Sequence, residues 1–176
     1  MIQIRKPNLD NLQDGVPKDF LDVMEYFNQG LAEGSYLYIP RKNPITTKEI
    51  RTLWLPSIKN NICFVAELDE KVIGSANCFF DVASSAYAQA KERKPGEIAL
   101  TVAPDRNHRL VGYGILSEMI KELRTQNKKA FFHTDSEFQE ERRMMRDLGH
   151  RGRLIKKYER YRKAGLSGKV YAYKLP

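Results

Sequence analysis

The sequence predicts an α+β fold in which helices flank a central, mixed and mostly antiparallel β-sheet. Three observations predict this class. Apolar residues recur at helical spacing in the N-terminal third, a β-rich hairpin follows, and strand-like and helix-like segments then alternate to the C-terminus. The 176 residues can bury one core and contain no internal repeat or linker, so a single domain over residues 1–176 is expected.

The N-terminal third is expected to hold one strand and two helices. Residues 1–6 alternate weakly and predict the strand. Residues 16–34 predict a helix, because apolar side chains recur there at helical spacing: Phe20, Val23, Met24, Phe27 and Leu31. A second helix is expected over residues 46–60, and Pro56 should limit its length.

A hairpin is expected next, because two β-rich runs within residues 62–80 surround the polar turn LDEK. Cys63 and Cys78 lie on its opposite arms, and the turn register decides whether they face each other. A loop or short helix over residues 81–96 leads to a strand over residues 97–103.

The last part of the chain is expected to alternate between helices and strands. A polar connection over residues 104–109 leads to a helix that is traced from Gly112 by Ile115, Leu116, Met119, Ile120 and Leu123. A strand over residues 129–134 and a helix over residues 136–150 follow. Residues 153–176 are expected to form two strands around the turn AGLSG.

The composition excludes several classes of protein. Apolar residues make up 41% and charged residues 30% of the chain, and no apolar run reaches the about 18–20 residues that a membrane span needs. The N-terminus lacks the apolar stretch of a signal peptide, and two cysteines cannot form a disulfide framework. We therefore expect a cytoplasmic protein without a membrane partner, as a monomer or homodimer.

The charge favours anionic partners. Thirty Lys and Arg residues against 22 Asp and Glu residues give a net charge of +8. The excess gathers in residues 142–163, which hold ten basic and two acidic side chains. This segment is either a solvated face or a surface that contacts an acidic protein or RNA. One interpretation of the whole chain is therefore a basic nucleic-acid- or ribosome-associated binding protein without catalysis.

The segment RLVGYG, residues 109–114, indicates a second interpretation. A strand, a Gly-rich loop and a helix together form a device that binds phosphate groups. A nucleoside-triphosphate loop is excluded, because no Lys-Ser or Lys-Thr pair follows the glycines. A dinucleotide site is disfavoured, because eight residues separate the end of the strand at Ala103 from Gly112.

The run EIALTVAPDRNHRLVGYGILSEMI resembles motif A of the GNAT superfamily of N-acetyltransferases. Its parts are the strand end Val102-Ala103-Pro104, a basic loop, the pattern R-x-x-G-x-G over residues 109–114, and an amphipathic helix. The order of elements agrees over nearly the whole chain. Three positions depart from the family pattern, since Phe138 stands where many members have Asn, Met145 where many have Tyr, and His150 where Phe is usual.

The resemblance implies an N-acetyltransferase that uses acetyl-CoA and transfers the acetyl group directly to a primary amine in a ternary complex. The acceptor would be a protein α-amine or lysine, a polyamine or a small metabolite. The resemblance also implies the contacts with coenzyme A. The amides of Leu110, Val111, Gly112, Tyr113 and Gly114 would hold its pyrophosphate beside Arg109, and Leu100, Thr101 and Val102 would pair with its pantetheine arm.

The resemblance and general chemistry suggest the catalytic groups. The Val102 amide would polarise the acetyl carbonyl. Glu97 is either the general base or a solvent-facing acid at a strand end. Tyr173, or alternatively Tyr171, is a candidate general acid. No metal is expected, because the three histidines lack the spacing of metal ligands: His108, His133 and His150.

Overall fold

The computed structural model describes residues 1–34, 43–58, 60–80, 95–104, 106–135, 138–155 and 170–176. Its centre is a seven-stranded sheet with the order β1-β4-β5-β6-β7-β9-β8. Every neighbouring pair is antiparallel except β6 and β7, which are parallel. The predicted mixed, mostly antiparallel sheet is therefore confirmed.

The strands of this sheet are β1 (Gln3–Arg5), β4 (Ile62–Leu68), β5 (Lys71–Phe79), β6 (Glu97–Val102), β7 (Ala130–Asp135), β8 (Arg153–Ile155) and β9 (Val170–Leu175). The helices are α1 (Lys18–Ala32), α2 (Thr47–Glu49), the π-helical turn η1 (Ile50–Trp54), α3 (Leu55–Ile58), α4 (His108–Thr125) and α5 (Gln139–Asp147). Within the described residues, no helix is both long and apolar enough to span a membrane.

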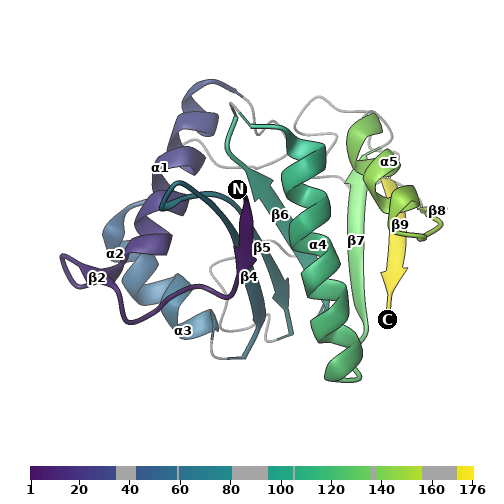
Figure 1. The fold of residues 1–176 in the computed structure, drawn as a ribbon, viewed down its shortest axis with the longest axis horizontal. Coiled ribbons are helices and arrows are strands. Elements are labelled where there is room, and N and C mark those ends of the chain that lie inside the picture. The colour runs from purple at the N-terminus through teal and green to yellow at the C-terminus, as the bar shows by residue number, and fades with distance from the viewer. Residues whose placement is uncertain (35–42, 59, 81–94, 105, 136–137, 156–169) are drawn as a thin grey trace.

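The helices cover the two faces of the sheet (Figure 1). Helix α4 lies on one face with α5 beside it, and α1 lies on the other face with α2, η1 and α3. The side chains of β6 alternate between these layers. Thr101 bonds to Tyr26 of α1, whereas Leu100 lies against Gly112 of α4. The apolar core fills both layers, so the sheet is buried on both faces.

Two turns explain how the N-terminal half is connected. Helix α1 ends before Gly34, whose φ of +70° suits glycine at a helix C-terminus. The hairpin of β4 and β5 turns at Asp69 and Glu70, both with positive φ. Its register pairs Cys63 with Asn77 and Cys78 with Ile62, so the two thiols point to opposite faces.

Three features differ from the sequence-based expectation. Pro56 lies inside α3 and does not end the second helical segment, which passes through the π-helical turn η1 just before it. A two-stranded ribbon, β2 (Leu12–Gln13) with β3 (Val16–Pro17), was not predicted, although its Asp-Gly turn is a hairpin signal. Helix α4 begins at His108, four residues before Gly112, so the predicted connection is shorter than expected.

The loop or short helix expected over residues 81–96 falls largely outside the described residues, as does the turn AGLSG. The other predicted elements are confirmed, including the helix that follows β7. In that helix, α5, two acids lie in the first turn and an arginine in the last, as the helix dipole favours.

Candidate active site

The strands β6 and β7 diverge toward their carboxyl ends (Figure 1). Their parallel pairing comprises Glu97 with Phe131 and Ile98 with Phe132. Beyond that point, the described residues of β6 and β7 no longer pair with each other. Strand β6 continues to pair with β5 up to Val102, and β7 with β9 up to Asp135. The sheet therefore opens after Ile98.

The backbone of β6 turns its groups alternately to its two neighbours. The amide of Ala103 donates to the carbonyl of Ile73, so it points toward β5. The amide of the preceding residue, Val102, therefore points to the other edge, where β6 has separated from β7, and so does the amide of Leu100. Two of the three residues expected to meet the pantetheine arm thus direct their backbone toward the divergence, while Thr101 directs its backbone toward β5.

The N-terminus of α4 lies at the same end of the molecule (Figure 1). Asn107 is the cap, and its Oδ1 accepts from the amide of Leu110 at 3.0 Å. The amide of Val111 donates to the carbonyl of Asn107, also at 3.0 Å. The amides of Asn107, His108 and Arg109 have no acceptor within the helix, so they and the helix dipole can attract an anion.

The two glycines have a packing role in this structure. A Cβ at Gly112 would lie 2.9 Å from Sδ of Met144 and 3.1 Å from a methyl group of Leu100. A Cβ at Gly114 would lie 3.2 Å from the side chain of Ile4. Gly112 and Gly114 therefore let α4 approach α5 and the sheet closely. Both glycines lie inside the helix, so they belong to the first turns of α4 and not to a loop before it.

The other residues of the motif point in different directions. The Arg109 guanidinium donates to Asp147 of α5 at 2.6 Å, and this hydrogen bond raises the pKa of Arg109. Leu110 and Tyr113 are exposed, whereas Val111 is buried against β5 beside Gly74. The structure therefore does not gather the side chains of residues 109–114 at one point.

Glu97 lies where β6 and β7 begin to diverge. Only 2% of the residue is exposed, so the interpretation as a solvent-facing acid is wrong. Its Oε1 lies 3.3 Å from Nδ1 of His133 on β7. Glu97 is four positions before Thr101 on β6, so its side chain projects from the same face, which carries α1. His133 contacts Glu97 and therefore lies on that face as well.

Tyr173 lies on the opposite face from Glu97. It pairs with Phe132 across β7 and β9, and its ring packs against Gly152. Burial raises the pKa of its hydroxyl, which therefore stays protonated at neutral pH. Tyr171 lies beneath the guanidinium of Arg142, 4.4 Å from the ring centre. The structure therefore does not bring either tyrosine together with Glu97.

Three hydroxyl groups meet on the α1 face, a cluster that was not predicted. Tyr26 Oη lies 2.7 Å from Ser75 Oγ and 3.1 Å from Thr101 Oγ1, and the two smaller hydroxyls are also 3.1 Å apart. Tyr26 lies on the buried face of α1 with Val23 and Phe27, and the sequence pattern gave no expectation for its hydroxyl. The cluster connects α1 with β5 and β6 at the diverging end of β6.

Replacing Tyr26 with Phe should lower the free energy of unfolding by about 1 kcal/mol, the ordinary net contribution of a hydrogen bond. Ser75 and Thr101 can still bond to each other, which limits the loss. Urea unfolding of both proteins measures the difference. A loss of unfolding free energy above about 3 kcal/mol would show that the hydroxyl of Tyr26 makes stabilising contacts besides those with Ser75 and Thr101.

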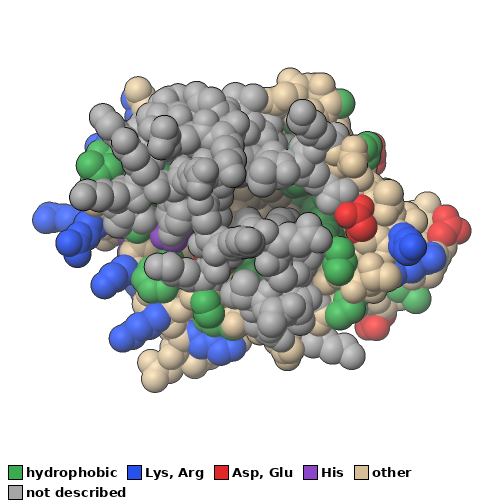
Figure 2. Space-filling model, turned by 180° about the vertical axis from the view of Figure 1, so that it is seen from behind, with side chains coloured by type: hydrophobic (Ala, Val, Ile, Leu, Met, Phe, Trp, Pro, Cys, Tyr) green, Lys and Arg blue, Asp and Glu red, His purple; other side chains and the backbone are tan. Residues whose placement is uncertain are grey.

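The basic side chains of α5 lie on its outward face. Gln139, Arg142, Arg143 and Arg146 line a shallow hollow there. Figure 2 shows the molecule from behind, with Lys and Arg side chains gathered along the left edge, the β8–β9 side of the sheet. Residues 156–163 of the basic segment fall outside the described residues. Within the described part of the chain, no three His, Cys, Asp or Glu residues form a metal-binding group.

Comparison with known families identifies the class of this protein. A profile of the acetyltransferase (GNAT) family matches residues 30–150, which is more than half of the chain. The chain therefore belongs to the GNAT family and is an N-acetyltransferase. A comparison with curated protein sequences found no significant match.

Solved structures of acetyltransferases show the same fold. A ribosomal-protein-alanine N-acetyltransferase from Brucella melitensis has a TM-score of 0.69 at 15% identity, with 98% of each chain covered. An N-acetyltransferase from Staphylococcus aureus Mu50 has a TM-score of 0.66 at 14% identity, covering 99% of this chain and 98% of the other. A phosphinothricin acetyltransferase from Sinorhizobium meliloti, in complex with acetyl-CoA, has a TM-score of 0.69 at 14% identity, covering 99% and 88%.

Proposed function

We propose that this protein transfers an acetyl group from acetyl-CoA to a primary amine, as one catalytic domain and by direct transfer in a ternary complex. The observation that carries the proposal is the early end of the β6–β7 pairing beside the N-terminal turn of α4. Helix N–H groups suit an anion, and the edge of a strand suits an extended chain with amide groups. Coenzyme A combines these two parts in one molecule.

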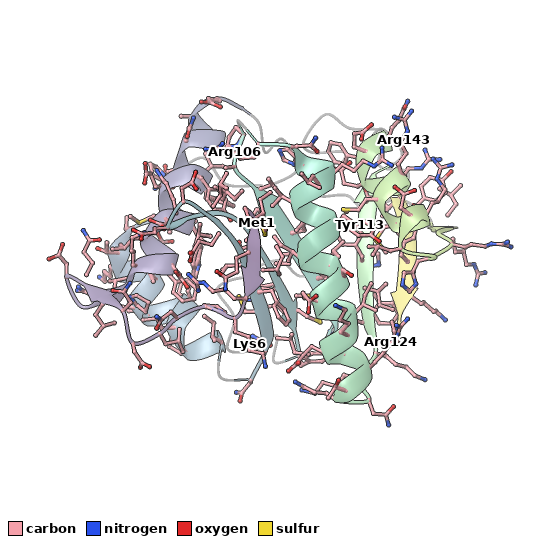
Figure 3. The ribbon with its side chains drawn as sticks, in the orientation of Figure 1. Met1, Lys6, Arg106, Tyr113, Arg124 and Arg143 are labelled. Carbon is pink, nitrogen blue, oxygen red and sulfur yellow. The ribbon has the colours of Figure 1, made fainter. Side chains whose placement is uncertain are left out.

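The first turn of α4 fits the pyrophosphate better than the glycines do. The amides of Asn107, His108 and Arg109 have no acceptor within the helix, whereas those of Leu110 and Val111 already donate. Arg106 adds a cation at this end of the molecule (Figure 3). We therefore place the phosphate contacts at the helix cap, a few residues before Gly112.

The divergent edge of β6 provides the second contact. Leu100 and Val102 direct their amides toward this edge, so an extended pantetheine arm can add there as a strand does. Acetyl-CoA supplies a thioester, whose carbonyl carbon reacts with the amine. The Val102 amide would donate to the carbonyl oxygen and stabilise the negative charge that develops there.

Glu97 is proposed as the general base. It lies at the point where the strands diverge, on the α1 face, and the acceptor amine would approach from that face. An alkyl ammonium cannot attack, so the nitrogen must lose a proton to Glu97, directly or through water. As the carbon–nitrogen bond forms, the nitrogen releases its second proton to solvent, and the carbon–sulfur bond breaks with its electron pair staying on sulfur.

No dedicated general acid is needed in this mechanism. Met145, at the position of the family tyrosine, is fully buried and has no proton to give. Tyr173 lies on the other face of the sheet from Glu97, so we propose that the thiolate takes its proton from solvent. A covalent acetyl-enzyme is disfavoured, because burial raises the pKa of the Cys63 and Cys78 thiols to about 12.

An amine panel with a free-thiol assay tests the proposed reaction. The panel should include polyamines, amino acids, aminoglycosides and peptides. One peptide should begin with alanine, because one of the similar structures is named a ribosomal-protein-alanine N-acetyltransferase. Thiol release that depends on both acetyl-CoA and an amine supports the proposal. Slow release that no amine accelerates would contradict it.

Replacing His108 with Pro should weaken coenzyme A binding about tenfold or more while the domain stays folded. Proline is well tolerated at the first position of a helix, but it removes the N–H group proposed to contact the pyrophosphate. Loss of one hydrogen bond to a charged group costs about 1.5–3 kcal/mol. Calorimetry with coenzyme A measures the change in affinity.

The matched control is His108→Ala, which removes the imidazole and keeps the N–H group. It should retain most of the affinity. If the proline and alanine variants bound coenzyme A equally well, the amide of His108 would not contact the phosphates, and the proposed place of the pyrophosphate would be incorrect.

The non-catalytic interpretation as a nucleic-acid- or ribosome-associated protein is set aside, because the chain belongs to the acetyltransferase family. A docking role for residues 142–163, a cytoplasmic location and a monomeric or homodimeric state stay predictions. The arginine-lined hollow on α5 supports an anionic partner for that surface.

A further inference from the structure

We propose that His133 is a positioning residue for Glu97, and that it acts by holding the carboxylate in the orientation that accepts the proton of the amine. The inference rests on the proposed function of Glu97. It is carried by the contact between Nδ1 of His133 and Oε1 of Glu97, which are 3.3 Å apart. The contact joins β6 to β7 at the point where their backbone pairing ends.

The place of this contact in the sheet is specific. Glu97 pairs with Phe131, and Ile98 with Phe132, after which the two strands diverge. His133 is therefore the next residue of β7 that projects from the α1 face, one step into the diverging region. The side chain of His133 reaches back to Glu97, which lies at the first of the two paired levels of β6.

Burial and chemistry restrict what the pair can do. The side chains of His133 and Glu97 are only 7% and 3% exposed. In its role as general base Glu97 is ionised, and an ionised carboxylate only accepts hydrogen bonds, so in this role Nδ1 of His133 carries the proton of the contact. The hydrogen bond then fixes the tautomer of the imidazole and directs one oxygen of Glu97 toward β7.

The neighbours of His133 hold its ring in place. The ring lies nearly parallel to that of Phe131, at 13° and with centres 6.5 Å apart. In the neighbouring strand β9, the cross-strand partner of His133 is the small residue Ala172. These neighbours favour one orientation of the imidazole, and an oriented donor favours one orientation of the carboxylate.

A purely structural role explains the pair less well. Two buried titratable side chains cost free energy of desolvation, and well-packed apolar residues of similar volume commonly replace such pairs without loss of stability. The preceding residue of β7 on the same face, Phe131, is apolar, so this part of the sheet accommodates apolar side chains. The pair occurs instead where the strands part, which points to use of the carboxylate.

A double-mutant cycle in the 176-residue chain tests the proposal. His133→Ala should lower kcat for the best amine of the panel at least tenfold and leave the KM for acetyl-CoA nearly unchanged. His133→Asn places an amide N–H near the position of Nδ1 and should keep kcat within about threefold to fivefold of the wild type. In the Glu97→Gln background, His133→Ala should change kcat less than twofold, because it acts through Glu97.

A spectroscopic measurement makes the test independent of turnover. Nitrogen-edited NMR of the imidazoles should show His133 with its proton on Nδ1 in the wild type. Glu97→Gln should shift the Nδ1 resonance, because the charged acceptor becomes neutral. An unchanged His133 signal, or a proton on Nε2 alone, would overturn the proposed contact.

The possible failures can be distinguished. If His133→Ala lowers kcat by the same factor in both backgrounds, His133 supports the fold and does not position Glu97, so the inference is overturned. If wild-type kcat is retained without His133, the inference is overturned as well. If the wild type releases no thiol with any amine, the proposed function fails and the inference fails with it.

Discussion

The Glu97→Gln variant is expected to lose two to four orders of magnitude in kcat at about pH 7, the range that general acid–base catalysis contributes. Gln has nearly the same shape as Glu but cannot take a proton from the amine. The measurement is steady-state thiol release with the best acceptor of the panel. Coenzyme A affinity should change little, because Glu97 lies on the α1 face, and the phosphate contacts are proposed at the N-terminus of α4.

The loss should shrink as the pH rises toward about 10, because an alkyl amine then arrives increasingly neutral and needs no base. Glu118→Gln is the matched control, since Glu118 is a partly exposed acid of α4 that pairs with Lys121. That variant should keep its turnover. A pH-independent loss in Glu97→Gln, or no loss at all, would assign the role of base to another group.

Replacing Gly112 with Val is expected to destabilise the fold by about 2–3 kcal/mol, the upper part of the usual range for overpacking. A Cβ at this position already lies 2.9 Å from Sδ of Met144, and the two further methyl groups of valine need additional space. Met144 is fully buried and Leu100 partly buried, so both side chains must shift inside a packed region to admit the valine. Urea unfolding measures the loss.

Gly114→Ala is the graded control. Its Cβ meets only the side chain of Ile4, at 3.2 Å, and that side chain can move slightly. Alanine also favours the helix relative to glycine, so the net change should stay below about 1 kcal/mol. Equal stability of Gly112→Val and the wild type would refute the packing role. If Gly112→Val lost coenzyme A binding but kept full stability, the glycines would instead be assigned to the phosphate site.

The sequence predicted the order of elements well, because most of them depend on local patterns. The apolar stripe of α1 and the alternation in β4 and β5 each lie within one segment. The start of α4 was not predicted, because the helix was traced from Gly112 along the apolar stripe that follows it. The cap Asn107 and the exposed residues after it carry no apolar signal.

The chemistry of the site was less accessible from the sequence. The motif predicted that residues 97–114 contain most of the active site. In the structure these residues form the diverging strand β6 and the N-terminus of α4. The burial of Glu97 and its contact with His133 depend on the register of the two parallel strands β6 and β7. The two residues lie 36 positions apart in the chain. The hydroxyl cluster around Tyr26 depends on how α1 lies on the sheet. No local pattern encodes either arrangement.

Calorimetric titration of the wild-type protein with acetyl-CoA tests the central claim most directly. The proposed function predicts saturable binding to one site per chain, with a dissociation constant between about 1 µM and 1 mM, the range of ordinary substrates. It also predicts affinity reduced about tenfold or more for His108→Pro, in which the proposed phosphate contact is removed. Absence of binding up to about 1 mM acetyl-CoA would contradict the account.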